Sequence, residues 1–214
     1  MRGAAVRGAA DRQEHRGALA RVLAYPYLAP DGAFSRAGGC PGEGPELVAF
    51  GANGDPEVLA EKLGADTPVS ARPALLADHD IVFSAHVSPY GAIPAALVSS
   101  PGTCVAVHLL RLAAKDRARL DATEPNYVRE ALAPGLEAYR SRHGVLTLDG
   151  GPVALAAVPA RGRTLPALTQ EALLERLRAL LDPTATLEAF VMAQVEHARV
   201  RAGRTAWLRS RASR

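Results

Sequence analysis

The segment from Leu47 to Gly64, LVAFGANGDPEVLAEKLG, constrains the fold of this chain most. Residues 47–50 form an apolar run that is typical of a buried strand, and the glycine-rich residues 51–54 end that run. Asp55 and Pro56 follow as a favoured helix N-cap and a favoured first helical residue. The segment therefore predicts a strand, a tight turn and a short helix. Because N–H groups at a helix start have no partner within the helix, such a turn favours negatively charged ligands; the alternative is a plain structural connection.

The composition is that of a globular protein, and the excess positive charge lies mainly at the two ends. The chain has 214 residues, of which 48% are hydrophobic and 22% charged, and its formal net charge is +3. This length allows one large domain with a buried core. Arginines gather in residues 2–16 and 199–214, where we expect solvated ends. Nucleic-acid binding by these arginines is kept as an alternative functional hypothesis. No apolar run approaches the length of a membrane span, so we expect no membrane partner and a cytoplasmic location.

Strand and helix signals along the chain predict an α+β protein organised in three segments. Residues 1–45 are expected to form an N-terminal arm that is partly helical or disordered. Residues 46–160 are expected to form the main domain. Residues 161–214 are expected to form a helical C-terminal extension that packs on this domain and ends in a basic tail.

Two features inside these segments make specific structural predictions. Ser99–Gly102, with the sequence Ser-Ser-Pro-Gly, predicts a hairpin turn between two apolar strands. Leucine and other apolar residues at helical spacing predict two helices, at residues 168–181 and 187–195. These two helices are expected to cover the main domain, because their apolar faces would otherwise be exposed.

Among the residues able to carry chemistry, Glu124 stands out. It follows a predicted helix and lies in the sequence Thr-Glu-Pro-Asn-Tyr, where few other charges surround it. A carboxylate can take up and return a proton during catalysis, and an acid on a surface turn is the alternative. The histidines show no metal-binding spacing, Cys40 and Cys104 lack a nearby second cysteine, and phosphate-binding and nucleophile-elbow motifs are absent from the sequence. We therefore expect no metal and no organic cofactor.

Three stretches of the chain form an ordered set. They are AFGANGDPEVLAEKLG at residues 49–64, VSSPGTCVAVHLL at residues 98–110 and LDATEPNYVR at residues 120–129. In their order and spacing they resemble the gamma-glutamylcyclotransferase-like superfamily, which opens with Tyr-Gly-Ser-Asn, continues through a strand pair around a Pro-Gly turn and reaches Leu-Asp-x-x-Glu-Gly before a tyrosine. The resemblance covers roughly residues 46–158. It implies a small closed mixed β-barrel flanked by helices, with the glycine-rich turn and the glutamate at one cavity.

The resemblance also implies a reaction without a cofactor and a role for each matching residue. The catalytic glutamate falls on Glu124, and a pocket tyrosine falls on Tyr127. The substrate-holding turn falls on Phe50, Gly51, Ala52 and Asn53. The implied activity is cyclisation of a γ-glutamyl group to 5-oxoproline with release of an amine or amino acid, in which Glu124 is the general acid and base. Backbone N–H groups of the turn would hold the substrate and stabilise the developing oxyanion.

The same stretches depart from the superfamily in ways that motivate a second hypothesis. Phe50 stands in place of the usual tyrosine, Ala52 in place of the usual serine, and Pro125 in place of the glycine that follows the glutamate. Because alanine removes a hydroxyl contact, the alternative is a non-catalytic module that binds a small molecule on the same fold. The expected partner of the enzyme is a small γ-glutamyl compound, and a homodimer is left open.

The stretch SAHVSPYGAIP, residues 84–94, predicts two further contacts with the ligand. Its Ser-Pro-Tyr-Gly sequence sharply ends the strand before it, and such breaks often re-aim side chains. We therefore expect His86 and Tyr90 to approach the same cavity as Glu124. The alternative is that both residues serve only in packing.

Overall fold

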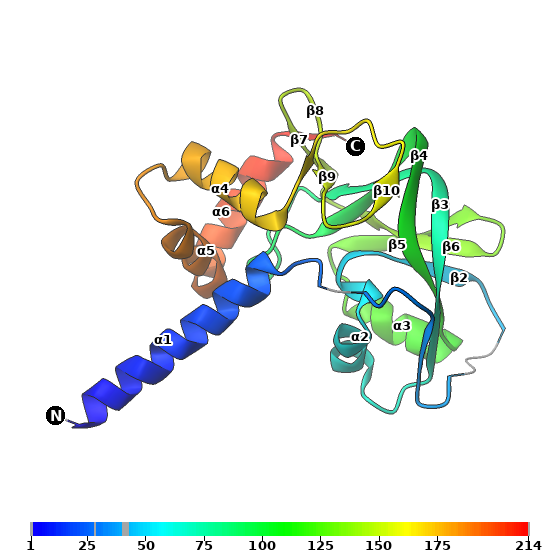
Figure 1. Cartoon of the computed structure of the whole chain (residues 1–214), viewed down its shortest axis with the longest axis horizontal. Coiled ribbons are helices and arrows are strands. Elements are labelled where there is room, and N and C mark those ends of the chain that lie inside the picture. The colour runs from blue at the N-terminus through cyan, green and yellow to red at the C-terminus, as the bar shows by residue number, and fades with distance from the viewer. Residues whose placement is uncertain (1, 28, 40–42, 214) are drawn as a thin grey trace.

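The computed structural model describes residues 2–27, 29–39 and 43–213, with side chains from residue 13 onward, and shows a mixed α+β protein (Figure 1). In this part of the chain the helices are α1 (Arg2–Leu23), η1 (a 3₁₀ helix, Gly51–Gly54), α2 (Pro56–Leu63), α3 (Ala114–Ala122), α4 (Gln170–Leu181), α5 (Leu187–Glu196) and α6 (Ala198–Arg209). The strands are β1 (Phe34–Arg36), β2 (Glu46–Ala49), β3 (Val69–Phe83), β4 (Ala95–Arg111), β5 (Tyr127–Ala133), β6 (Leu136–Ser141), β7 (Val145–Leu148), β8 (Gly151–Pro152), β9 (Ala154–Leu155), β10 (Ala160–Arg161), β11 (Ala167–Leu168) and β12 (Ala212–Ser213). The predicted α+β class is confirmed.

A mixed sheet built around two long antiparallel strands, β3 and β4, forms the centre of the fold. Its strand order is β11-β9-β3-β4-β2-β6-β5, with β1 beside β3 and β10 beside β4. β2 runs antiparallel to β4 and parallel to β6. Within the described residues no pairing joins the end strands β5 and β11, so the predicted closed barrel is not confirmed. A single bridge between Ser84 and Val145 connects the end of β3 to the small sheet β12-β7-β8.

The strand, turn and helix expected between Leu47 and Gly64 are confirmed as β2, η1 and α2. Leu47 is buried in the core, as an apolar strand residue should be. The Asp55 carboxylate accepts hydrogen bonds from the N–H groups of Glu57, at 2.7 Å, and Val58, at 3.3 Å. This N-cap satisfies two backbone donors that the helix itself cannot.

The predicted hairpin at Ser99–Gly102 is wrong, because β4 runs through these residues without a turn. Gly102 has a φ of +81°, and its N–H donates to the Asp78 carboxylate at 2.9 Å. Asp78 itself has a φ of +57° and lies where the register of β3 against β4 shifts, between Ala77 and His79. The irregular backbone of β3 at Asp78 thus lies opposite the irregular backbone of β4 at Pro101-Gly102, which forms a bulge instead of a turn. The chain instead reverses between Phe83 and Ala95.

The two C-terminal helices expected from apolar periodicity are confirmed as α4 and α5. Leu173 and Leu177 of α4 and Phe190 of α5 are fully or almost fully buried and belong to the same core cluster as Phe83 and Ile93 of the sheet region. Each helix begins with a threonine N-cap that accepts a backbone hydrogen bond. The helices therefore share one hydrophobic core with the sheet.

The basic C-terminal end, expected to be solvated, forms the helix α6 over residues 198–209, in which Arg199 and Arg209 are exposed but Arg204 is packed against α5. The Arg204 guanidinium lies 3.5 Å from the centroid of the Phe190 ring. It also donates to the Phe190 carbonyl oxygen at 2.6 Å and to the Gln194 side-chain oxygen at 2.7 Å. Arginine in this segment therefore ties α6 to α5 through a cation–π contact and hydrogen bonds.

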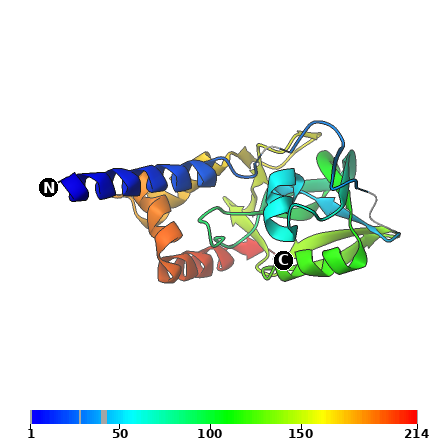
Figure 2. The same cartoon turned by 90° about the horizontal axis from the view of Figure 1, so that it is seen from below.

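The first half of α1 extends away from the rest of the molecule, while its C-terminal end reaches the core (Figures 1 and 2). Val22 and Tyr25 are buried, and α1 packs on α4 and α5. Further along the chain, β1 pairs with β3. None of the helices in the described ranges combines the length and hydropathy that a membrane crossing requires.

Candidate functional site

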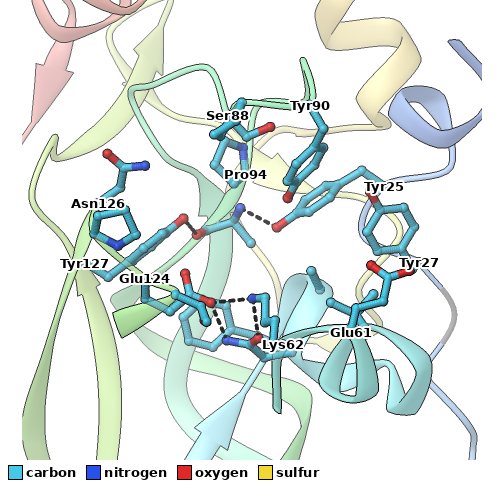
Figure 3. A pocket seen from close by; sticks show the side chains of 18 of the residues that line it. Tyr25, Tyr27, Glu61, Lys62, Ser88, Tyr90, Pro94, Glu124, Asn126 and Tyr127 are labelled. Atoms are coloured by element: carbon cyan, nitrogen blue, oxygen red, sulfur yellow. Dashed lines mark hydrogen bonds and ion pairs between the residues drawn. The ribbon is translucent and has the colours of Figure 1, made fainter. Parts of the chain in front are cut away.

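A cavity of about 290 Å³ lies where η1 and α2, the segment 84–94, the turn before β5 and the residues that follow α1 come together (Figure 3). Figure 3 shows Glu124 and Lys62 on one side of the cavity and Ser88, Tyr90 and Pro94 on the other. We call the first side the charged floor, made of Asn53, Lys62 and Glu124. We call the second side the 84–94 wall, which also carries His86.

The charged floor is a compact group of hydrogen bonds around one carboxylate oxygen. Lys62 Nζ lies 2.5 Å from Glu124 Oε1, and Asn53 Nδ2 donates to the same oxygen at 3.0 Å. Lys62 Nζ also donates to Asn53 Oδ1 at 2.7 Å. The side chains of Lys62 and Glu124 are only 22% and 13% exposed, so solvent screens this ion pair little. Within the described residues no hydrogen bond reaches Glu124 Oε2, which leaves this oxygen free for a ligand.

Local structure explains why these three side chains meet. Asn53 belongs to η1, and η1 ends directly before the N-cap of α2. Lys62 is in the last turn of α2. Glu124 lies in a tight turn after α3, because its N–H donates to the Asp121 carbonyl at 3.0 Å and its own carbonyl accepts from the Tyr127 N–H at 3.0 Å. The packing of α2 against α3 then places the amine and the carboxylate side by side.

Two tyrosines hold the start of β4 at the edge of the cavity. The Tyr25 hydroxyl accepts a hydrogen bond from the Ala95 N–H at 2.7 Å. The Tyr127 hydroxyl donates to the Ala95 carbonyl oxygen at 2.8 Å. Burial raises the pKa of both hydroxyls well above the ordinary value, and the charge of Glu124 raises the pKa of Tyr127 further. Both tyrosines therefore stay neutral and keep these bonds at physiological pH.

The 84–94 wall is held in place by two buried glutamines from the C-terminal helices. Gln194 Nε2, on α5, donates to the Gly91 carbonyl oxygen at 2.5 Å. In the amide orientation that satisfies both partners, Gln170 of α4 donates to the Ile93 carbonyl at 3.1 Å and accepts from the Ile93 N–H at 2.7 Å. Tyr90 directly precedes the anchored Gly91 and lines the cavity, where burial raises the pKa of its hydroxyl. The helical extension thus positions one side of the cavity.

His86 is the buried histidine of this wall, with 2% of its surface exposed. Its Nδ1 lies 2.8 Å from the Ser84 hydroxyl oxygen, and its ring lies edge-on to Tyr127, with 5.7 Å between the ring centroids. The His143 ring is 4.6 Å away. Burial first, and the neighbouring His143 second, lower the pKa of His86 to about 3. The imidazole is therefore neutral at physiological pH.

The structure brings together seven of the eight residues predicted for the site. Those that line the cavity are Phe50, Ala52, Asn53, His86, Tyr90, Glu124 and Tyr127. Gly51 does not line it, because its Cα faces the Tyr25 hydroxyl and the Ala95 methyl group. A φ of +60° and this close approach explain the glycine without a ligand contact. The roles assigned to the seven residues remain predictions.

Several cavity residues were missed from the sequence. Lys62 is one of only two lysines in an arginine-rich chain, which is a signal that could have singled it out. Tyr25 and Tyr27 come from the N-terminal arm, for which no functional role was predicted. Arg21 of α1 and Glu61 of α2 form an ion pair of 2.8 Å at the cavity edge. The arm therefore contributes part of the cavity lining.

Among the residues with described side chains, no three His, Cys, Asp or Glu residues gather as a metal-binding group. Cys104 is a free cysteine, and Cys40 lies outside the described residues. Comparisons with protein families, with curated proteins and with solved structures found no match to this chain.

Proposed function

We propose that this protein cyclises the γ-glutamyl group of a small molecule to 5-oxoproline and releases an amine or amino acid. One observation carries the proposal: a carboxylate, Glu124, faces an aromatic-lined cavity with one oxygen anchored and the other free. Lys62 and Asn53 hold Oε1, so the carboxylate keeps one orientation while Oε2 can exchange protons with a ligand. Such a fixed acid–base group suits a reaction whose chief need is proton transfer.

The proposed reaction balances without a co-reactant. Oε2 of Glu124 first takes a proton from the α-ammonium group of the substrate, because only the free amine can attack. The amine nitrogen then forms a bond to the γ-carbonyl carbon, and the bond from that carbon to the leaving nitrogen breaks. The attacking nitrogen loses two protons in total, and the leaving amine gains two, which Glu124 passes on one after the other. N–H groups at the start of η1, beside Ala52, are proposed to stabilise the oxyanion.

The proposal includes the small mixed barrel that the resemblance implies. Its support is the bridge between Ser84, which follows β3, and Val145, the first residue of β7. Strand pairing connects β3 to β4, β4 to β2 and β2 to β6. β7 follows β6 in the chain, and the bridge from its first residue returns to the end of β3. A closed circuit of this kind would place the cavity at one end of the barrel.

A panel of γ-glutamyl amino acids and γ-glutamyl amines, with 5-oxoproline measured by mass spectrometry, tests this proposal. We expect turnover of at least one compound by the wild-type protein. The matched control is Glu124→Gln, which keeps the size and the hydrogen bonds to Lys62 and Asn53 but cannot carry the proton. Its turnover should fall by about 10²- to 10⁴-fold.

The second candidate is a small-molecule-binding module without catalysis. The ion pair between Lys62 and Glu124 motivates it, because an ammonium group already occupies one carboxylate oxygen. Saturable binding of a γ-glutamyl compound in the cavity, with no 5-oxoproline released from any compound of the panel, would favour this second candidate over the enzyme.

A further inference from the structure

A buried chain of side-chain hydrogen bonds runs behind the 84–94 wall and ends at His86. Ser141 Oγ lies 2.7 Å from Ser84 Oγ, and Ser84 Oγ lies 2.8 Å from His86 Nδ1. Ser141 Oγ also accepts a hydrogen bond from the His143 N–H at 3.1 Å. Ser84, His86 and Ser141 are all at most 4% exposed. The direction of this chain decides which imidazole nitrogen carries the proton.

Of the two directions in which this chain can run, only one gives both serine hydroxyl protons an acceptor. A third arrangement, in which Ser84 accepts from both neighbours, would need the Ser84 proton to reach the Tyr127 hydroxyl nearby, whereas the hydrogen bonds that Ser84 Oγ makes within the described residues are those with His86 and Ser141. If His86 Nδ1 carried the proton, it would donate to Ser84, and Ser84 would donate to Ser141. The Ser141 hydroxyl proton would then have no acceptor among the described residues, because the other partner of Ser141 Oγ is itself a donor. In the opposite direction, Ser141 donates to Ser84, and Ser84 donates to an unprotonated Nδ1. Buried hydroxyl groups are nearly always paired, so the second direction is favoured.

The other ring nitrogen, Nε2, is not sealed from solvent. His86 lines the cavity, and no hydrogen bond within the described residues reaches Nε2. Nε2 is also not among the unpartnered atoms that are sealed from solvent, which in the described part of the chain are Tyr27 Oη and His143 Nδ1. A group bound in the cavity can therefore reach it.

We propose that the proton of the His86 imidazole sits on Nε2 and is donated to an oxygen atom of the ligand bound in the cavity. This oxygen is the γ-carbonyl oxygen of a γ-glutamyl compound or the lactam oxygen of 5-oxoproline. The identity of the acceptor rests on the proposed function, whereas the position of the proton follows from the hydroxyl chain alone. His86 then contributes a fixed hydrogen bond at the wall across from Glu124 and takes no proton from the substrate.

The surroundings of His86 keep this donor uncharged. The titratable groups that face it are the His143 ring and the Tyr127 hydroxyl, and Glu124 lies across the cavity. Burial and His143 both disfavour a second proton on the ring, which agrees with the lowered pKa of His86. A neutral N–H donor stabilises a developing oxyanion without competing for the proton that Glu124 transfers.

Long-range ¹⁵N–¹H correlation spectroscopy of the histidine side chains in the full-length protein measures the position of this proton. We expect His86 to show a protonated Nε2 and an unprotonated Nδ1, with no change between pH 7.5 and about pH 5. His197, which is exposed, provides an internal reference in the same spectrum. A proton on Nδ1, or a doubly protonated ring at pH 5, would overturn the proposal.

Titration with 5-oxoproline then tests the contact itself. The His86 Nε2 resonance should shift with saturation, and His86→Leu should weaken binding about tenfold, whereas His86→Gln, which keeps a donor near the Nε2 position, should retain most of it. No shift of His86 at saturation would overturn the contact. Failure of the proposed function is a separate result. A His86 shift without any 5-oxoproline formation would support His86 as a hydrogen-bond donor and contradict the cyclising activity. Turnover with an unperturbed His86 resonance would contradict the His86 contact and support the cyclising activity.

Discussion

The two sides of the cavity differ in charge and in how they are built. The charged floor pairs an amine with a carboxylate and is formed by two pieces of the chain, η1 with α2 and the turn after α3. The 84–94 wall contains neutral donors and is held by α4, α5 and hydroxyl groups from distant strands. Since the environment of a group decides its chemistry, we assign proton transfer to the floor and fixed hydrogen bonding to the wall. We therefore propose that the two sides of this small cavity divide these two tasks between them.

The largest effect is expected from loosening the helices that support the wall. Leu177 of α4 is 2% exposed, whereas Leu180 of the same helix is 57% exposed. We expect Leu177→Ala to lower the free energy of unfolding by about 2–5 kcal/mol, because it leaves a cavity in the core that α4 shares with the sheet. Chemical denaturation with urea measures this change.

Leu180→Ala is the matched control for this experiment, and its effect should stay within about 0.5 kcal/mol. Equal effects of the two substitutions would show that α4 does not share the core with the sheet. This result would contradict the account in which α4 holds the 84–94 wall in place.

The next effect in size concerns the floor. Lys62→Ala removes the cation that holds Glu124 Oε1 and leaves Asn53 as its remaining partner. We expect the turnover of a γ-glutamyl substrate to fall by about tenfold to a hundredfold, as for the loss of a charge-assisted hydrogen bond. Steady-state kinetics at saturating substrate measures it.

Addition of methylammonium to Lys62→Ala should restore part of the lost activity, because a small cation can occupy the vacated position. Lys115, which lies on α3 and does not line the cavity, provides the control substitution Lys115→Ala. Activity of Lys62→Ala equal to that of Lys115→Ala would show that the ion pair does not position the carboxylate.

Residues on both sides of the cavity could be predicted from the sequence, namely Asn53 and Glu124 of the floor and His86 and Tyr90 of the wall, whereas Lys62 of the floor was missed. The strand, turn and helix around Asn53 depend on local signals, namely the glycine-rich turn and the Asp55 cap, and the structure confirms them. Glu124 was singled out by its sequence context, and it does line the cavity. Leucine and other apolar residues at helical spacing likewise predicted α4 and α5 correctly.

The contacts that assemble the cavity could not be predicted in the same way, because they are long-range. Lys62 and Glu124 of the floor are 62 positions apart. Tyr25 bonds to Ala95, which is 70 positions away in the chain, and Gln194 bonds to Gly91 across 103 positions. The Ser-Ser-Pro-Gly sequence has strong turn propensity, yet β4 continues through it because Asp78 on β3 compensates the bulge. Tertiary pairing overrode the local preference there.

A further effect is a dependence of stability on pH that belongs to the wall. The folded protein lowers the pKa of His86 to about 3, from 6.5 in the unfolded chain. Between these two values the unfolded state binds more protons, so the free energy of unfolding falls as the pH decreases from 6.5 toward 3. The slope from His86 is at most about 1.4 kcal/mol per pH unit.

Comparison with His86→Gln isolates this contribution, because His143 titrates in both proteins. We expect wild type to lose stability relative to the variant as the pH falls from 6.5 to 4, in thermal or urea unfolding. Parallel stability curves over this range would contradict the description of His86 as a buried neutral imidazole.

The most direct test of the division between floor and wall is one comparison of rates. We would measure 5-oxoproline formation by Glu124→Gln and by His86→Gln, each relative to wild type, with the same γ-glutamyl substrate at saturation. We expect a loss of about 10²- to 10⁴-fold for Glu124→Gln and of at most about tenfold for His86→Gln, since glutamine can replace a hydrogen-bond donor but not an acid–base group. A loss for His86→Gln that equals or exceeds the loss for Glu124→Gln would contradict the assignment of proton transfer to Glu124.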